Sequence, residues 1–395
     1  MRIGIVSPCN PSEFKEFFSC GQDVPDINKG ASAVNTLVKE FLRQGHYVKV
    51  FTSYNGTEGI KKFIGPQIEF FMCQNNKPLP FTAFLSRLYM VPRIVDIIRK
   101  EVSDLDVLHA HWTYEYAMAA MVFAKRLPVF CTVRDWCPYI QTTQVGFRNI
   151  LFWKVSRFVF ERVMANRHIH FIANSHYTYN CIVKRYPNKK VMIIPNPIEK
   201  GYILDKEKQH IETAKFIAIS QAIGDKRKNY DMLLHAFKCF HERYPDSELL
   251  LVGAGFVNSN HYVLRWKEQN LLSGVKLCGF VNHNKLMELI DKSSCLIHPS
   301  LEETFGNILL EGMARCKPCI GGKDSGAVPM VLGHGKYGVL CDVKDLSSIV
   351  YAMEKTCDRD FVLALTSRTT KYLKTAFASN IIANSHIALY RKYIE

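Results

Sequence analysis

Short apolar segments with the character of buried β-strands recur along the chain, and segments with the periodicity of amphipathic helices lie between them. In the first half, such strands are expected at residues 2–7, 47–52, 106–112, 127–132, 168–173 and 192–194. In the second half, they are expected at residues 216–219, 248–252, 275–279 and 295–298. Alternation of strands and helices is typical of parallel sheets covered by helices. The sequence therefore predicts an α/β fold with two such series.

The length supports two domains, because 395 residues exceed what one ordinary hydrophobic core accommodates. The strand–helix pattern breaks near residues 195–208, where Gly201 and a charged run at 205–208 are typical of a connection between domains. We expect an N-terminal Rossmann-like domain at residues 1–197 and a second one that begins at residue 198. Two tandem α/β domains facing across a cleft is the architecture that this organisation implies.

The formal net charge is +15, and it is concentrated in the first half of the chain. Residues 1–200 contain 26 lysines and arginines against 15 acidic residues. This excess predicts an anionic partner, and the absence of any nucleic-acid-binding signature favours an anionic membrane surface over nucleic acid. Two basic helical segments, at residues 81–100 and 147–167, are the candidates for membrane contact. An ordinary helix with one buried and one solvated side is the alternative for each.

Cysteine usage and hydropathy bear on the location of the protein. The thirteen cysteines are scattered and lie mostly in apolar runs, which favours reduced thiols in the cytoplasm. The single Cys-x-x-Cys, at Cys316 and Cys319, lacks a second pair for zinc and is expected to pack between a helix and a strand. No stretch reaches membrane-spanning length, and the first residues are too short for a signal-peptide core.

Two glutamates frame the segment at residues 299–314, which follows an apolar strand and a Pro-Ser turn. Glu303 is expected in the loop before a helix that begins near Asn307, and Glu311 about one turn inside that helix. Because a helix that opens after a strand directs unpaired N–H groups outward, its start is a ready site for an anion. Spacing alone does not separate this interpretation from two solvent-exposed glutamates.

Polar residues end several strands of the first half, at the edge where open parallel sheets bind their ligands. His109 and His111 end one strand, and Arg134 and Asp135 follow the next. A single His-x-His pair is more often a packing or hydrogen-bonding feature than a metal site. No Gly-x-Gly-x-x-Gly follows the first strand, so the fingerprint of a nicotinamide or flavin site is absent there.

The order of these motifs resembles the retaining glycosyltransferases of the GT-B fold, in particular the large family-four group that uses nucleotide-diphosphate sugars. Glu303 and Glu311, with Phe305 and Gly306 between them, match the two-glutamate signature of that family. Residues 106–112 resemble its Asp-hydrophobic-His-x-His strand, residues 194–196 its interdomain Pro-Asn, Lys228-Asn229 its phosphate-binding loop, and residues 325–329 its Gly-rich turn. The resemblance covers nearly the whole chain.

The resemblance implies a donor domain at residues 198–375 and a final helix, at residues 376–395, that packs back on the first domain. It implies that Lys228 and the N–H groups of Phe305, Gly306 and Asn307 bind the donor diphosphate without a metal or other cofactor. Glu311 would accept hydrogen bonds from the ribose, and Glu303 would face the donor sugar. His111, Arg134 and Asp135 would lie on the acceptor side.

The chain departs from the family pattern at two places. Where the family has an arginine before the loop lysine, this chain has Ile223, so Lys226 or Arg227 is expected to substitute in donor binding. Arg134 occupies the position of a usual histidine, and a permanently charged guanidinium is a clamp for phosphate or carboxylate rather than a proton acceptor. We expect Arg134 and Asp135 to bind the acceptor; a structural pair at a strand end is the alternative.

The resulting hypothesis is a retaining glycosyltransferase, with Glu303, Lys228, Asp135 and Arg134 as its catalytic candidates. It would transfer a sugar to a saccharide or polyprenyl-linked acceptor in bacterial surface polysaccharide or lipopolysaccharide synthesis, at the inner face of the cytoplasmic membrane. Two alternatives remain open. One is a nucleotide-sugar epimerase or sugar phosphorylase on the same fold, and the other is a non-catalytic sugar-nucleotide or polysaccharide-binding protein.

Overall fold

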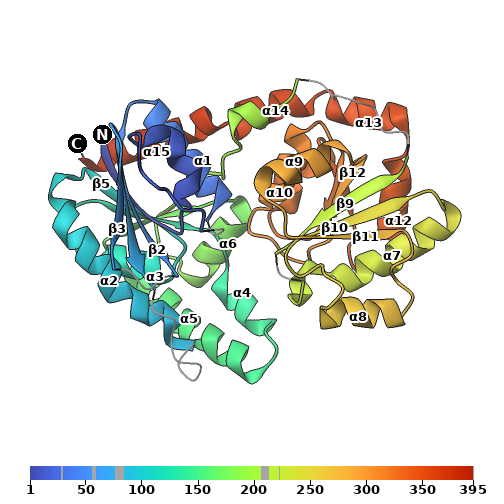
Figure 1. Cartoon of the computed structure of the whole chain (residues 1–395), viewed down its shortest axis with the longest axis horizontal. Helices are drawn as coiled ribbons and strands as arrows, with labels where there is room; N and C mark the ends of the chain where they lie inside the picture. Colours follow the sequence, from blue (N-terminus) through green and yellow to red (C-terminus); the bar gives the residue numbers. More distant parts are fainter. Residues whose placement is uncertain (28–29, 56–58, 76–83, 206–212, 222, 395) are drawn as a thin grey trace. The chain divides into compact units, whose positions relative to one another are not determined.

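The computed structural model describes residues 1–395 except 28–29, 56–58, 76–83, 206–212, 222 and 395. The chain divides into two compact units (Figure 1). Unit 1 comprises Met1–Pro197 and Ser379–Glu395, and unit 2 comprises Ile198–Ala378. The chain therefore returns to unit 1 at Ser379 rather than at the expected position 376. Both units are α/β, as the sequence predicted.

Unit 1 is built on a sheet whose described strands run in the order β3-β4-β2-β1-β5-β6-β7-β8. Every neighbouring pair is parallel except β3 with β4. The strands are β1 Arg2–Val6, β2 Tyr47–Tyr54, β3 Lys61–Ile64, β4 Ile68–Gln74, β5 Val107–His111, β6 Val129–Val133, β7 Ile169–Ala173 and β8 Val191–Ile193. The antiparallel β3–β4 hairpin at the edge was not predicted, because the lysines of β3 conceal its short apolar alternation.

Helices cover the sheet of unit 1 through apolar stripes. In α1, residues Val34, Leu37, Val38 and Phe41 are fully buried, and each such side chain contributes roughly 1.5–3 kcal/mol of transfer free energy. The other helices of unit 1 are α2 Ser86–Glu101, α3 Glu115–Ala120, α4 Cys137–Thr142, α5 Phe147–Ala165, α6 His176–Arg185 and α15 Ser379–Ile394, with α1 at Ser32–Arg43 and short 3-10 turns at Pro11–Phe17, Val102–Asp104 and Met121–Phe123.

The last helix, α15, completes the core of unit 1. Tyr390 is fully buried, and its hydroxyl lies 2.6 Å from Nδ1 of His109 on β5. At the start of the helix, the hydroxyl of Ser379 donates to Oε2 of Glu40 on α1 at 2.8 Å. The prediction that a final helix packs on the N-terminal domain is confirmed.

Unit 2 has a parallel sheet whose described strands run in the order β11-β10-β9-β12-β13-β14. They are β9 Lys215–Ile219, β10 Glu248–Val252, β11 Val275–Gly279, β12 Cys295–His298, β13 Cys319–Gly322 and β14 Val339–Cys341. Its helices are α7 Tyr230–Arg243, α8 His261–Glu268, α9 His283–Asp291, α10 Asn307–Ala314, α11 Val328–Val331, α12 Leu346–Lys355, α13 Arg359–Thr366 and α14 Thr369–Ala376, with 3-10 turns at Lys200–Tyr202, Lys226–Lys228 and Gly333–Gly335.

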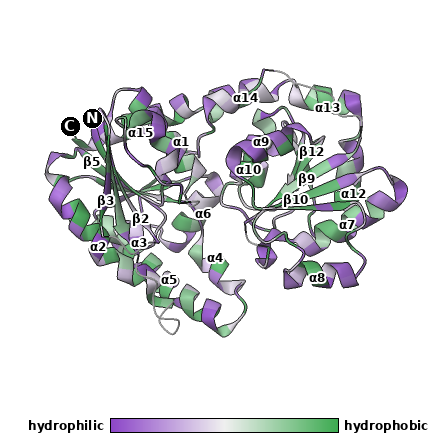
Figure 2. Ribbon diagram, viewed as in Figure 1, coloured by the Kyte–Doolittle hydropathy of each residue, from purple (hydrophilic) through white to green (hydrophobic). Residues whose placement is uncertain are grey.

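The strands of unit 2 are largely apolar, and Figure 2 shows β9, β10 and β12 in green. Because β9, β12 and β13 are neighbours in a parallel sheet, the loops that follow them emerge at the same edge. This edge is where ligands of open α/β sheets bind.

Two expectations about the whole chain concern membranes and thiols. Among the described residues, no helix has both the length and the apolar character needed to cross a bilayer. All thirteen cysteines are free thiols. Cys316 follows α10 and Cys319 begins β13, and their sulfurs lie near the backbone oxygens of Leu204 and Leu309, so the Cys-x-x-Cys packs between helix and strand.

Candidate functional site

Three loops of unit 2 meet at the carboxyl edge of its sheet: 225–229 after β9, 299–306 after β12 and 323–327 after β13. Backbone hydrogen bonds join them directly. The N–H of Leu301 donates to the carbonyl of Arg227 at 2.7 Å, and the N–H of Ala327 donates to the carbonyl of Glu303 at 2.8 Å. The three loops therefore form one connected structure around Glu303.

Asn229 fastens the first loop to the other parts of this edge. Its backbone has φ 58°, a left-handed conformation that asparagine adopts more readily than most residues. Its amide nitrogen donates to the carbonyls of Pro299, at 3.2 Å, and Val343, at 2.7 Å. These contacts hold Lys228, the preceding residue, against the loop that carries Glu303.

Gly306 positions the start of α10. Its φ is 89°, a conformation that favours glycine, and a Cβ at this position would make a tight contact of 3.2 Å with Cδ1 of Leu309. Phe305 is buried against Phe377, which leaves its backbone rather than its ring for a ligand. The first N–H groups of α10 follow at Asn307, as the sequence predicted.

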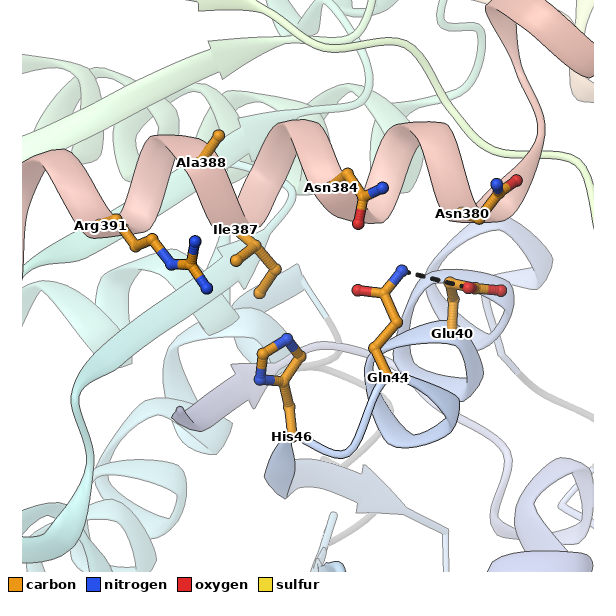
Figure 3. Close-up of a pocket in the computed structure, with 8 residues that line it drawn as sticks. All are labelled: Glu40, Gln44, His46, Asn380, Asn384, Ile387, Ala388 and Arg391. Carbon is orange, nitrogen blue, oxygen red and sulfur yellow. Dashed lines mark hydrogen bonds between the residues drawn. The ribbon is translucent and has the colours of Figure 1, made fainter.

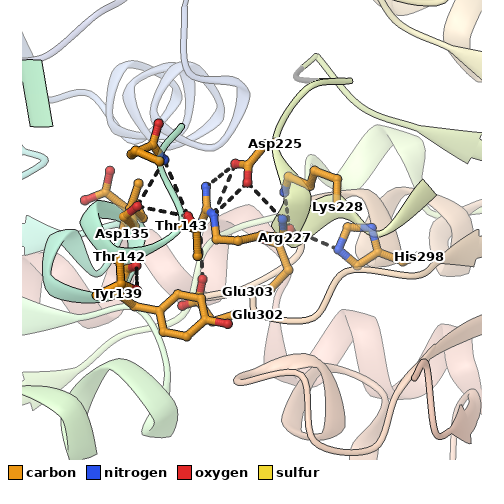
Figure 4. A network of polar contacts seen from close by, with 12 residues as sticks. Asp135, Tyr139, Thr142, Thr143, Asp225, Arg227, Lys228, His298, Glu302 and Glu303 are labelled. Carbon is orange, nitrogen blue, oxygen red and sulfur yellow. Dashed lines mark hydrogen bonds and ion pairs between the residues drawn. The ribbon is translucent and has the colours of Figure 1, made fainter. Parts of the chain in front are cut away.

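Lys228 and Glu303 form the central ion pair of the site. The ammonium of Lys228 donates to Oε1 of Glu303, and Nε2 of His298, at the end of β12, lies 3.1 Å from the same oxygen (Figure 4). Burial acts to raise the pKa of Glu303, but Lys228 and His298 outweigh it and hold the pKa well below its usual range. Glu303 is therefore a carboxylate at neutral pH.

Arg227 and Lys226 have different environments from Lys228. The guanidinium of Arg227 lies 2.6 Å from Oδ2 of Asp225 and 3.0 Å from Oε2 of Glu302 (Figure 4). Lys226 is exposed and makes no ion pair among the described residues. The charge of Arg227 is thus compensated by two carboxylates, and Arg227 connects the loops after β9 and β12. Of the three predicted cations, Lys228 is the one beside Glu303.

Glu311 differs from Glu303 although both belong to one motif. It lies one turn inside α10 and is 8 % exposed, and its carboxyl group makes no hydrogen bond or ion pair within the described part of the chain. Burial raises its pKa to about 7. In the loops after β12 and β13, the hydroxyls of Ser300 and Ser325 are also buried and have no hydrogen-bond partner among the described residues.

In unit 1, Arg134 follows β6 and is buried. Its Nε donates to Nδ1 of His111 at 3.1 Å, and its NH1 donates to Oδ1 of Asn196 at 2.7 Å. Burial lowers the pKa of Arg134 to about 10, which leaves it charged at neutral pH. Asp135, the next residue, accepts a hydrogen bond from the hydroxyl of Tyr114 at 3.0 Å.

The contact with Arg134 fixes the protonation of His111. Arginine is only a donor, so Nδ1 of His111 is the acceptor and its proton lies on Nε2. Burial, followed by His109 and Arg134, lowers the pKa of His111 well below its ordinary value, so the ring is neutral. Its Nε2 is buried with no partner, as are Oγ1 of Thr113 and Nδ2 of Asn174 at neighbouring strand ends. His111 therefore offers a buried N–H to a ligand.

His109, by contrast, is structural, since its two ring nitrogens contact Tyr390 and Thr132. Among the described residues, no group of three or more histidine, cysteine or acidic side chains is arranged to hold a metal ion.

Sequence reasoning missed Trp112, Asp225 and Glu302. Trp112 has φ 65°, an uncommon conformation for a bulky residue, and lies directly after β5 with its ring centroid 5.7 Å from the guanidinium carbon of Arg134. No local pattern signals this conformation. Asp225 and Glu302 could have been noticed, because each lies beside a predicted site residue and carries a charge that Arg227 would match.

A separate cavity of about 650 Å³ lies in unit 1 between α1 and α15 (Figure 3). Its lining includes Gln44, His46, Asn384 and Arg391. His46 precedes β2, so this cavity is at the amino edge of the sheet. None of the predicted site residues lines it.

Comparisons with known proteins agree with this geometry. A family model described as "Glycosyltransferase Family 4" matches residues 30–201, and one described as "Glycosyl transferases group 1" matches residues 203–372. Together they cover most of both units. The chain belongs to the GT-B glycosyltransferases of the family-four type.

Relatives with similar sequences include glycosyl-transferring enzymes. The chain is 24 % identical over 374 residues to an N-acetyl-α-D-glucosaminyl L-malate synthase from Bacillus anthracis, covering 91 % of this chain and 93 % of that protein. It is 23 % identical over 337 residues to an α-monoglucosyldiacylglycerol synthase from Acholeplasma laidlawii, covering 77 % and 79 %.

Solved structures show the same fold. A sucrose-phosphate synthase from Thermosynechococcus elongatus superimposes with a TM-score of 0.75 at 17 % identity, covering 99 % of this chain and 98 % of that one. Anabaena HepE, in complex with UDP and glucose, superimposes with a TM-score of 0.67 at 17 % identity, covering 99 % and 100 %.

Proposed function

We propose that the protein transfers a sugar from a nucleotide-diphosphate sugar to a saccharide or polyprenyl-linked acceptor, with retention of anomeric configuration. The observation that carries the proposal is the Lys228–Glu303 pair, held by three loops at the ligand-binding edge of a unit that matches the glycosyltransferase family. A cation beside a carboxylate suits a donor that has an anionic diphosphate and a polyhydroxylated sugar.

Donor binding would redistribute the charges of unit 2. Lys228 would turn from Glu303 toward the diphosphate, and the first N–H groups of α10 would add hydrogen bonds to it. Glu303 would then accept hydrogen bonds from the sugar, and Glu311, whose carboxylate has no protein partner, from the ribose. The charge of the leaving diphosphate is neutralised by these groups, so the proposal requires no metal.

The reaction breaks the bond between the anomeric carbon and the diphosphate oxygen and forms one from the acceptor oxygen to the same carbon. For retention, the acceptor attacks on the face that the diphosphate leaves. The acceptor proton then passes to a phosphate oxygen, and the products are the glycoside and the nucleoside diphosphate. Lys228 stabilises the charge on the leaving group, which is how electrostatic preorganisation lowers such a barrier.

For the acceptor, unit 1 offers Arg134 and His111. A buried guanidinium beside a buried N–H favours an anionic group, because both are donors and the guanidinium carries a charge. We propose an acceptor with a phosphate or carboxylate, such as a lipid diphosphate; the name of the Bacillus anthracis relative includes an anionic acceptor, L-malate. Asp135 would orient a hydroxyl of the acceptor, because a carboxylate accepts hydrogen bonds through both of its oxygens.

The pathway that fits these substrates is the synthesis of a bacterial surface polysaccharide or lipopolysaccharide. A polyprenyl-linked acceptor resides in the membrane, so the enzyme would work in the cytoplasm, at the inner face of the cytoplasmic membrane. The Acholeplasma laidlawii relative is named for a lipid product, which supports an acceptor of this kind.

The donor side is tested by a thermal-shift screen of nucleoside diphosphates and their sugars, beginning with UDP, followed by donor hydrolysis. We expect nucleoside diphosphates with one particular base to raise the melting temperature of the wild-type protein. The Lys228→Met substitution should abolish that increase. Lys226→Met is the matched control, because Lys226 lies two residues away in the same loop and is exposed. Binding without hydrolysis or transfer for any donor would favour the non-catalytic alternative.

The acceptor side is tested with Arg134→Ala and Arg134→Lys in steady-state kinetics. We expect the apparent KM for an anionic acceptor to rise at least about tenfold in Arg134→Ala, with partial recovery in Arg134→Lys, while the donor KM changes little. An unchanged acceptor KM in Arg134→Ala would show that Arg134 is a structural residue.

A further inference from the structure

Helix α5 in unit 1 carries large apolar side chains that the fold leaves in solvent. Phe147 is 80 % exposed, Val145 just before the helix 61 %, Phe158 56 % and Ile150 41 %. Single exposed apolar residues are ordinary, but four within one short segment indicate an interaction surface.

These residues share one side of the helix. Phe147, Ile150, Lys154 and Phe158 follow one another at spacings of three and four residues and are all exposed. The opposite side packs inward, with Ser156, Val159, Phe160 and Val163 buried. Helix α5 therefore has two apolar faces: one packs against the core of unit 1, and the opposite one is exposed to solvent.

Basic residues are interspersed with the exposed apolar ones. Arg148, Lys154 and Arg162 are exposed and form no ion pair among the described residues. The one acidic residue between positions 145 and 162 is Glu161, whose carboxylate is engaged by Arg157, Arg185 and Tyr186. The exposed face is therefore apolar and cationic, without a free negative charge. We call Val145, Phe147, Arg148, Ile150, Lys154, Phe158 and Arg162 the α5 face.

Helix α2, the other basic segment expected to contact a membrane, is different. Residues 81–83 of that segment lie outside the described residues. Arg87 is bound to Glu115 at 2.6 Å and to Ser156 at 2.9 Å, and Arg93 donates to the carbonyl of Gln74 at 3.0 Å. Arg99 pairs with Asp96 in its own helix. Arg87 and Arg93 thus connect α2 to other elements of unit 1, and these contacts do not support the prediction of a docking face on α2.

We propose that the α5 face docks the enzyme on the anionic surface of a membrane. Aromatic side chains that enter the interfacial layer, combined with cations that meet lipid phosphates, are the chemistry of peripheral helices. Binding of a protein partner would need a larger apolar patch, or acidic residues on that partner. An anionic bilayer needs only exposed apolar side chains and cations, which the α5 face has. The inference rests on the proposed function, since a lipid-linked acceptor places the reaction at such a surface.

The experiment is co-sedimentation of the full chain with vesicles of phosphatidylcholine alone or mixed with phosphatidylglycerol. We expect binding to the mixed vesicles, little binding to the neutral ones, and release when NaCl is raised to about 0.5 M. Phe147→Ser with Phe158→Ser, or Arg148→Gln with Lys154→Gln and Arg162→Gln, should each weaken binding at least about tenfold.

Matched control variants remove an exposed aromatic ring or three positive charges from unit 2 instead of from the α5 face. Tyr351→Ser removes a ring that is 59 % exposed on α12, and a triple change of the exposed Lys267, Lys336 and Lys371 to glutamine removes the same net charge from unit 2. Wild-type protein that does not sediment with anionic vesicles, face variants that bind as well as wild type, or controls that lose as much binding would each overturn the proposal.

The test of membrane docking can fail or succeed independently of the test of the proposed function. The α5 variants should keep the nucleotide-induced thermal shift and donor hydrolysis, and Lys228→Met should keep vesicle binding. Failure of vesicle binding with intact donor hydrolysis would reject the docking surface alone. If wild type self-associates through the α5 face, as gel filtration of the serine variants would reveal, the face belongs to a second copy of the chain and the membrane proposal is wrong.

Discussion

Glu303 and Glu311 show that the environment of a residue, not its type, decides its charge. Both are glutamates of one short motif, yet the pKa of Glu303 is held far down by Lys228 and His298 against the effect of burial, and that of Glu311 is raised to about 7 by burial alone. The first carries a permanent negative charge, and the second changes charge near neutrality. A ligand that donates hydrogen bonds to Glu311 would stabilise its ionised form.

This difference predicts the behaviour of Glu311→Gln. Because the folded pKa of Glu311 lies above its unfolded value, its contribution to stability is present at acid pH and is lost as pH rises toward about 7. Above that pH, ionising the buried carboxyl costs about 3 kcal/mol at most, so Glu311→Gln should raise the free energy of unfolding by about 1–3 kcal/mol at pH 8.

Urea denaturation of wild type and Glu311→Gln at pH 8 and pH 5 checks this prediction. The increase in the free energy of unfolding should be smaller at pH 5 than at pH 8. Nucleotide binding should weaken in the same variant. A variant less stable than wild type at pH 8 would show that Glu311 makes favourable contacts in its ionised form.

Arg227 gives a second prediction at the residue scale. Its guanidinium meets Asp225 and Glu302 together, a geometry that the point charge of lysine does not reproduce. Arg227→Lys should lower the free energy of unfolding by about 1–3 kcal/mol, because a partly buried, two-sided pair is weakened.

Chemical denaturation measures this loss, with Lys226→Gln as the control that should stay within about 0.5 kcal/mol of wild type. Donor affinity should fall less than in Lys228→Met. An equal loss of donor affinity in both variants would mean that Arg227 contacts the diphosphate.

At the scale of elements, the site depends on loops that are fastened to one another rather than on any single helix. Asn229 combines a left-handed backbone with two side-chain hydrogen bonds to neighbouring loops. Two substitutions separate these roles. Asn229→Gly keeps the left-handed backbone and should lower the free energy of unfolding by about 1–2 kcal/mol, because the two side-chain hydrogen bonds are lost. Asn229→Ala also adds backbone strain and should lower the free energy of unfolding by about 2–3 kcal/mol.

Thermal unfolding of the two variants gives the comparison. Both should reduce nucleotide affinity, because Lys228 is the next residue. Equal stability of the glycine and alanine variants would show that the left-handed conformation relaxes without cost.

The elements were largely predictable from the sequence, and the contacts between loops were not. Helix α7, for example, begins at Tyr230 and ends at Arg243, and its apolar stripe and flanking loops are local signals that the sequence shows. The fold followed from the alternation of such elements. The β3–β4 hairpin was missed because the four-residue edge strand β3 carries little periodicity.

In the candidate site, the family resemblance assigned Lys228 and Glu303 to the donor side, and the structure places the two side chains in contact. The sequence shows the charges of Asp225 and Glu302, but it could not show that both reach Arg227, because Glu302 is 75 positions away and only the fold brings it to the guanidinium. Nor could it predict the buried N–H of His111, which depends on the direction of a hydrogen bond from Arg134. Side-chain partners across loops are set by tertiary structure, which no local pattern encodes.

At the scale of the whole molecule, the residues proposed to bind the donor belong to unit 2 alone, and each unit has its own core. A ligand stabilises the state that binds it, by about 2.7 kcal/mol at a hundredfold excess over its Kd. A cognate nucleotide should therefore raise the unfolding temperature of unit 2 and leave that of unit 1 nearly unchanged.

Differential scanning calorimetry with and without nucleotide measures this, and the intrinsic fluorescence of Trp266 in unit 2 and Trp136 in unit 1 can be isolated by substitution to assign each transition. A single transition that shifts as a whole would mean that the two units unfold together.

Tyr390 and the rest of α15 belong to a unit whose other residues come before unit 2 in the chain. On the ribosome, unit 1 would therefore wait for its last helix while roughly 180 further residues are made, which takes about 10–40 s at 5–20 residues per second. During that interval, the ring of His109 and the apolar side of α1 lack the helix that covers them. Unit 2, whose residues are continuous, can fold meanwhile. During this interval unit 2 can be complete while unit 1 still lacks its last helix, and this is when chaperones would be most needed.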